Sequence, residues 1–225
     1  MKVCKYDNII FDFDSTVIRF ESLELIMKNL LEGNKQKIQQ IKALTNAGMN
    51  GEISFRESLE SRLKVAAPSR QALKKFVAHY CPQALTSGIL QLIQKLYAEG
   101  IKIWIISGGF TEIILPFSEV LNIPMSRVYA VNLNWDENGK FKSLNNDNGF
   151  CDSKVIGVKK IQDKFVGKTL IVGDGFTDYE LFTSGGIADE FIAYTEHVAR
   201  YKVLKLSLLC AKNTKELSQL ILEAK

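Results

Sequence analysis

Ile9-Ile10-Phe11-Asp12-Phe13-Asp14-Ser15-Thr16 begins with a short apolar run, which two carboxylates follow. Its first three residues are β-rich and follow polar Asp7-Asn8, a pattern that predicts a buried parallel strand rather than a helix. In open α/β sheets the reacting groups gather at the carboxyl ends of the strands. We therefore expect Asp12 and Asp14 to lie at the functional edge of a parallel sheet.

The spacing of these two carboxylates suits phosphoryl transfer. One carboxylate can attack phosphorus and become an aspartyl phosphate, while the other handles the proton of the leaving group. An isolated Asp-x-Asp is, however, more often a solvated ending of a strand. The rest of the chain must therefore supply the other groups that this chemistry needs.

A second strand candidate, Ile101–Ile106, ends in Ser107-Gly108-Gly109. A hydroxyl followed by two glycines can bring a hydrogen-bond donor and bare backbone N–H groups close to a phosphate. The same residues also form ordinary turns. Their place after a strand makes them candidates for phosphate binding.

Lys154 stands near the start of a predicted helix, after Cys151-Asp152-Ser153. An ammonium group there can contact a phosphate oxygen and offset the repulsion between an anionic nucleophile and an anionic substrate. An exposed lysine says little about function by itself. We expect Asp152 to cap the helix and to point away from the phosphate.

The fourth segment is the apolar run from Thr169 to Gly173, followed by Asp174-Gly175-Phe176-Thr177-Asp178. Mg²⁺ prefers oxygen ligands and takes one or two carboxylates from a protein. Asp12 and Asp174, at adjacent strand ends, would supply them. Asp178 and Thr177 would then orient the lysine and the waters on the metal.

With these four segments in this order, the sequence closely resembles the haloacid dehalogenase superfamily of phosphatases. The resemblance implies a Rossmann-like α/β core with a parallel sheet (residues 1–19 and 88–225) and an inserted helical cap (20–87). It also implies Mg²⁺-dependent hydrolysis of a small phosphomonoester, with Asp12 as the nucleophile and Asp14 as the acid and base. Mg²⁺ would bind Asp12, Asp174 and the backbone carbonyl of Asp14. Ser107, the Gly109 amide and Lys154 would bind the phosphate.

A narrower resemblance, to the phosphoserine phosphatase family, rests on the segments 12–21, 54–62 and 107–110. It implies that Glu21 faces the ammonium group of the substrate and that Arg62 binds its carboxylate. Phe55, Gly108 and Thr177 would complete the substrate site. Without the resemblance, Glu21 also fits as an acid favoured by a helix dipole, and Arg62 as a surface helix residue.

Apolar residues between the first and second motifs recur at helix spacing, which predicts four short amphipathic helices. Their stripes are Leu23, Ile26, Met27, Leu30 and Leu31; Ile38, Ile41 and Leu44; Phe55, Leu59 and Leu63; and Leu73, Phe76, Val77 and Tyr80. These helices would form a lid that excludes bulk water from the reaction.

Five further elements are expected outside the motifs. Residues 111–121 match a helix that contains Pro116, which should kink the helix or mark its true start. Asn138-Gly139 predicts a hairpin between Val128–Leu133 and Phe141-Lys142. The remaining strand candidates are Phe191–Tyr194 and Val203–Leu208, and Asn213-x-x-Glu216 resembles a capping box before a last helix.

The composition favours one compact enzyme domain. The chain has 225 residues, of which 46% are hydrophobic, and a net charge of +4 from 29 basic and 25 acidic residues. This mild, scattered charge gives little support to nucleic-acid binding, and no apolar stretch is long enough to predict a membrane span.

The four cysteines have neither CxxC spacing nor a paired framework, which favours a reduced, cytoplasmic chain. The two histidines lie away from the motifs, so the sequence gives little support to a zinc site.

Two other functions stay open at this stage. The same chemistry could act on a different small phosphomonoester, or transfer the phosphoryl group from phosphoserine to a second amino-acid alcohol. A non-enzymatic phosphate-binding protein is the other alternative, against which the intact pair Asp12 and Asp14 argues. The sequence leaves the oligomeric state open.

Overall fold

The structure is a computed structural model that describes residues 4–50 and 52–222. Within these residues a six-stranded sheet, in the order β3-β2-β1-β6-β7-β8, forms the centre of the molecule, and all its neighbouring strands are parallel. Its strands are β1 (Asn8–Phe11), β2 (Lys102–Phe110), β3 (Val128–Val131), β6 (Thr169–Gly173), β7 (Glu190–Tyr194) and β8 (Leu209–Ala211). The predicted α/β fold with a parallel core sheet is confirmed.

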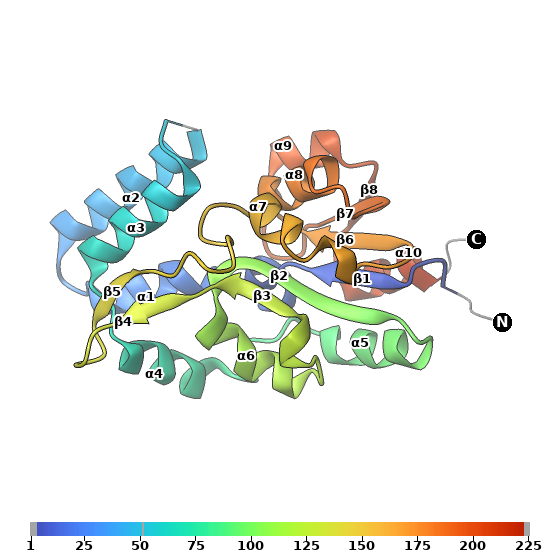
Figure 1. The fold of residues 1–225 in the computed structure, drawn as a ribbon, viewed down its shortest axis with the longest axis horizontal. Coiled ribbons are helices and arrows are strands. Elements are labelled where there is room, and N and C mark those ends of the chain that lie inside the picture. Colours follow the sequence, from blue (N-terminus) through green and yellow to red (C-terminus); the bar gives the residue numbers. More distant parts are fainter. Residues whose placement is uncertain (1–3, 51, 223–225) are drawn as a thin grey trace.

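Helices cover both faces of this sheet (Figure 1). On one side lie α5 (Ile89–Ala98), α6 (Thr111–Val120) and α10 (Thr214–Leu222), and on the other α7 (Lys154–Lys159), α8 (Phe176–Ser184) and α9 (Tyr201–Leu206). Alternate residues of β1 enter the two cores, because Ile9 and Phe11 pack with the first group of helices and Ile10 with the second. A strand buried on both faces tends to be apolar without interruption, as Ile9 to Phe11 of β1 are.

The segment between β1 and β2 contains the four predicted amphipathic helices. They are α1 (Ser22–Leu30), α2 (Lys35–Asn50), α3 (Phe55–Ala66) and α4 (Arg70–Tyr80). Ser54 and Ser69 cap α3 and α4, because each side chain accepts a hydrogen bond from a backbone N–H in the first turn. Figure 1 shows α2 and α3 side by side beyond the ends of the strands. The division into a core and a cap at residues 20–87 stays a prediction.

The predicted hairpin is partly wrong. Val128–Val131 is β3 and pairs with β2 in the main sheet, whereas the hairpin consists of β4 (Leu133–Trp135) and β5 (Phe141–Leu144). The turn signal at Gly139 located the hairpin correctly, since its φ of +70° suits glycine. Local sequence could not show that the apolar run before the turn divides between two sheets.

The predicted strand Val203–Leu208 is wrong. Residues Tyr201–Leu206 form α9, and the edge strand is β8 at Leu209–Ala211. Val203 is buried, whereas Leu208 is 99% exposed, so the apolar run packs one side only against the core. A short apolar run does not distinguish the two structures by its pattern.

Smaller elements complete the described chain. An irregular helical turn, η1 (Phe13–Val17), follows β1, and two 3₁₀ turns are η2 (Met125–Arg127) and η3 (Gln162–Lys164). Pro116 lies inside α6 and does not mark its start. Asn213 and Glu216 bond each other at the start of α10, as the capping pattern predicts. In residues 4–50 and 52–222, no helix has both the length and the apolar composition that a membrane span requires.

Candidate active site

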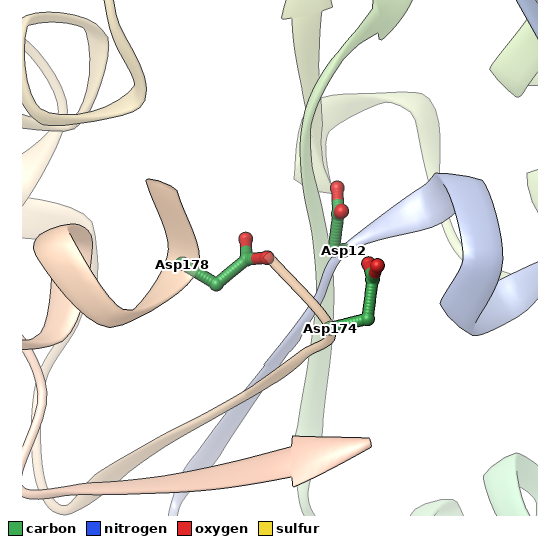
Figure 2. Close-up of side chains that lie close together, drawn as sticks. All are labelled: Asp12, Asp174 and Asp178. Carbon is green, nitrogen blue, oxygen red and sulfur yellow. The ribbon is translucent and has the colours of Figure 1, made fainter. Parts of the chain in front are cut away.

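Three aspartates meet where β1 and β6 end. Asp12 follows β1 and Asp174 follows β6, and these neighbouring strands end level because Phe11 pairs with Val172. Asp178, in the first turn of α8, directs its carboxylate toward the other two (Figure 2). One oxygen from each residue lies within 4.8 Å of the others, and the three side chains are buried. The strand ends thus assemble acids that lie far apart in the sequence.

Lys154 joins this cluster from the start of α7. Its Nζ lies 2.7 Å from Asp12 Oδ1 and 2.5 Å from Asp178 Oδ1. Burial alone would lower the pKa of Lys154, but the charges of the two aspartates outweigh it and raise that pKa above its usual value. The site therefore holds a buried, charged ammonium group beside Asp12.

The cluster fits a hard divalent cation. Burial and the negative charge of Asp12 raise the pKa of Asp174 and of Asp178 to about 7. Asp12 Oδ1 is buried and makes no hydrogen bond, although the Lys154 ammonium lies beside it. Carboxylate oxygens are the ligands that Mg²⁺ takes from proteins, and such an ion would relieve the repulsion among these acids.

Asp14 lies on the other side of the strand end and is held by the start of α1. Its two oxygens accept hydrogen bonds from the backbone N–H and the hydroxyl of Ser22, at 3.1 and 3.0 Å. Burial raises the pKa of Asp14 well above its usual range, and the charges of Glu21 and Asp12 raise it further. Asp14 therefore holds a proton more readily than an exposed carboxyl group does.

The glycine-rich end of β2 forms the opposite wall. Ser107 Oγ accepts a hydrogen bond from the backbone N–H of Gly109 at 3.0 Å. A Cβ on Gly109 would lie 3.3 Å from Ser107 Oγ and 3.4 Å from Asp14 Oδ2, so a side chain there would crowd both groups. A Cβ on Gly108 would lie 3.2 Å from the ring of Phe55, which places this α3 residue over the loop.

Arg62, two turns beyond Phe55 on α3, is a half-buried cation. Its Nε donates a hydrogen bond to the Ser58 carbonyl, at 3.3 Å, and in the described chain it makes no ion pair with a carboxylate. Burial lowers the pKa of Arg62, and the charges of Glu24 and Glu21 act against that shift. This cation is available to an anionic group of a ligand.

Glu21 directly precedes α1 and is also half-buried. It accepts a hydrogen bond from Ser15 Oγ at 2.8 Å, and its pKa is raised by burial. Thr177 lies at the exposed start of α8. The structure thus brings Glu21 close to the acids at the strand ends, whereas Thr177 lies toward the solvent.

Arg200 is a site residue that the sequence analysis missed. Its Nε lies 2.9 Å from Asp174 Oδ2, and its Nη2 lies 3.0 Å from Glu21 Oε1. Arg200 directly precedes α9, in the loop after β7, and β7 is the neighbour of β6. The strand-end rule that selected Asp174 could also have selected the polar residues after Tyr194.

The prediction that Asp152 caps the helix of Lys154 is wrong. Ser153 caps α7, because its side chain accepts a hydrogen bond from the backbone N–H of Ile156 at 3.0 Å. Asp152 instead forms an ion pair with Arg56 of α3, at 2.7 Å. Its charge is therefore balanced by a residue from the segment between β1 and β2.

A cavity of about 940 Å³ adjoins the site on the side of Glu21. It runs between α1 and α2 and is bounded by Val198 in the loop before Arg200. Most of its wall is apolar, from side chains such as Phe20, Leu25 and Ile38. Its size lies at the upper end of the range for small-molecule pockets.

Comparison with known proteins identifies the family. The model of the haloacid dehalogenase-like hydrolase family matches residues 9–183. The phosphoserine phosphatase of Rattus norvegicus is 33% identical over 89% of this chain and 86% of its own length, and that of Homo sapiens is 32% identical over 88% and 85%. The crystal structure of a phosphoserine phosphohydrolase-like protein from Francisella tularensis is 48% identical, with a TM-score of 0.89 over 96% of this chain and 99% of that one. The chain therefore belongs to the haloacid dehalogenase-like hydrolases, among their phosphoserine phosphatase-like members.

Proposed function

We propose that this chain is a Mg²⁺-dependent phosphatase that hydrolyses L-phosphoserine through an aspartyl phosphate on Asp12. One observation carries the proposal: Asp12 and Asp174 lie buried at adjacent strand ends, and the buried ammonium group of Lys154 contacts Asp12. The similarity to phosphoserine phosphatases supports the choice of substrate. The absence of paired cysteine spacing supports a reduced, cytoplasmic compartment.

Asp12 attacks the phosphorus atom, and the bond to the serine oxygen breaks. Asp14 protonates the leaving serine oxygen, a role that suits a carboxyl group whose pKa is raised by burial. Asp14 then takes a proton from the water that hydrolyses the aspartyl phosphate, which returns Asp12 to its carboxylate form. The Ser107 hydroxyl, the Gly109 amide and the Lys154 ammonium bind the phosphate oxygens as negative charge moves between them.

Asp12, Asp174 and the backbone carbonyl of Asp14 would hold the metal ion. When bound, Mg²⁺ neutralises charge on the phosphoryl oxygens. Asp178 acts through Lys154, because its carboxylate contacts the ammonium group and fixes its place beside Asp12.

Arg62 and Glu21 give the site its preference for an amino-acid substrate. Phosphoserine carries a carboxylate, which suits the planar guanidinium group of Arg62, and an ammonium group, which suits Glu21. Arg62 lacks an ion pair in the described residues, so a substrate carboxylate would find a free partner. Arg200 forms an ion pair with Glu21 in this structure, so it competes with the substrate ammonium for that carboxylate.

A second candidate is the same chemistry on a larger phosphomonoester. The cavity of about 940 Å³ beside Glu21 favours it, because phosphoserine is too small to fill such a volume. Phosphomonoesters of amines with an apolar group would place that group between α1 and α2. A second alcohol that accepts the phosphoryl group could use the same space.

A phosphate-release screen with Mg²⁺ tests both candidates. It should include phosphoserine, phosphoethanolamine and phosphorylated amines of increasing size, with Asp12→Asn as the inactive control. We expect phosphoserine to give the highest kcat/KM. A larger ester that is hydrolysed faster would favour the second candidate, and release that persists in Asp12→Asn would contradict both.

A further inference from the structure

The loop before α7 contains a negative charge that the proposed chemistry does not use. Asp152 lies two residues before Lys154, whose ammonium contacts Asp12. The substrate and the released phosphate are both anions, and a like charge nearby weakens their binding. Ser153, not Asp152, caps the helix, so helix capping does not account for the acid.

The partner of Asp152 comes from α3. Arg56 Nη1 lies 2.7 Å from Asp152 Oδ1 and 3.7 Å from the sulfur of Cys151. In residues 4–50 and 52–222, no other ion pair joins α2 or α3 to the core, since the Lys64–Glu60 pair stays within α3. The side chains of Arg56 and Asp152 are 35% and 32% exposed, so water can replace the contact when the helices move.

Arg56 lies on α3 close to the two side chains of that helix that we propose contact the substrate. It is the neighbour of Phe55, whose ring lies against Gly108 of the phosphate loop, and Arg62 follows on the same helix. Asp152 belongs to the loop that leads directly into Lys154, between β5 and α7 (Figure 1). One contact thus connects the helix that carries Phe55 and Arg62 with the segment that carries Lys154.

We propose that Arg56 and Asp152 form a latch that closes the helix pair α2–α3 over the active site and promotes phosphate release when it opens. In the closed state Arg56 neutralises Asp152, so the phosphate is held without a competing anion. Opening removes Arg56 and leaves the charge of Asp152 two residues from Lys154. This proposal rests on the proposed phosphatase chemistry, but not on phosphoserine as the substrate.

Two single variants distinguish the effect of losing the ion pair from the effect of the Asp152 charge on phosphate binding. Arg56→Ala and Asp152→Asn both remove the ion pair, so kcat/KM for p-nitrophenyl phosphate with Mg²⁺ should fall about two- to fivefold in both, as for a partly exposed pair. Their inhibition by inorganic phosphate should differ. Arg56→Ala keeps the anion, so its inhibition constant should be about two- to fivefold higher than that of Asp152→Asn. A contact that only stabilises the fold would change both variants equally.

Hydrogen exchange tests the closure without reference to activity. Amides at the start of α3 and in residues 146–153 should exchange faster in both single variants than in the wild type. The double variant Arg56→Asp/Asp152→Arg should restore slow exchange. Lys64→Ala is the matched control, because it removes an ion pair within α3 and should change neither exchange nor phosphate inhibition.

The outcomes distinguish this proposal from the proposed function. Three results would overturn the latch. The amides of the single variants could exchange at the wild-type rate, phosphate could inhibit the two single variants equally, or the amides of the double variant could exchange as fast as those of the single variants. A wild type that hydrolyses no phosphomonoester, but whose exchange responds to the variants as described, would support the closing contact and refute the proposed function instead.

Discussion

Arg62→Ala should remove the proposed preference of this enzyme for phosphoserine over phosphoethanolamine. The two esters share the phosphate and the ammonium group, and only phosphoserine has a carboxylate. In the structure Arg62 is half-buried, and its one hydrogen bond in the described residues goes to the carbonyl of Ser58 in its own helix. Its guanidinium group can therefore balance a substrate carboxylate.

The size of the effect follows from that environment. Truncating one partner of a buried, hydrogen-bonded charge pair costs about 2–5 kcal/mol, because the other charge is left unpaired. Since Arg62 is only half-buried, we expect the lower part of this range, about 2–3 kcal/mol, which is about 30- to 150-fold in kcat/KM for phosphoserine. Phosphoethanolamine never contacts the guanidinium group, so its kcat/KM should change little.

The assay is phosphate release from both esters by the wild type, Arg62→Ala and Arg62→Lys. Lysine keeps the charge but loses the planar pair of donors, so Arg62→Lys should recover only part of the preference. Arg56→Ala provides a comparison on the same helix, because it should lower kcat/KM for both esters alike. The reasoning is refuted if the wild type hydrolyses both esters equally well, or if Arg62→Ala keeps the full preference.

Three further predictions concern the acids at the strand ends. Asp12→Asn should abolish turnover and formation of the phosphoenzyme, whereas Asp14→Asn should lose about 10²–10⁴-fold in kcat; near-normal hydrolysis by Asp12→Asn would contradict the assigned nucleophile. Chelation with EDTA should stop the reaction and Mg²⁺ should restore it, while Ca²⁺ should inhibit because it accepts more and looser oxygen ligands; full activity after exhaustive chelation would argue against a metal site. Folding raises the pKa of Asp174 and of Asp178 from 3.8 to about 7, so these groups make the metal-free protein less stable as the pH rises from about 4 through 7. Mg²⁺ would bind Asp174 only in its proton-free form, so it should raise Tm more at pH 8 than at pH 6, and an equal rise at both pH values would count against the shift of Asp174.

Much of the site could be predicted because its residues stand beside strands that local sequence identifies. Asp12, Ser107 and Asp174 each follow a short apolar run, and parallel strands end at one edge of a sheet. The helices α1 to α4 were also predictable, because their apolar stripes recur at helix spacing. The wrong prediction of a strand at Val203–Leu208 shows the limit of that approach, because a short apolar run is too brief for its periodicity to distinguish a strand from a helix.

Local sequence was enough to predict the parallel-sheet core, the order of the motifs and the acids that follow β1 and β6, because periodicity and strand-end chemistry act over a few residues. Which distant charges meet depends on the tertiary structure. Arg200 bonds Glu21 across 179 residues of sequence, and Arg56 bonds Asp152 across 96. Such pairs depend on how the helices and loops pack on the finished sheet. No local pattern specifies that packing, because a charged residue on a helix or in a loop has the same local signature whether it faces solvent or a buried partner.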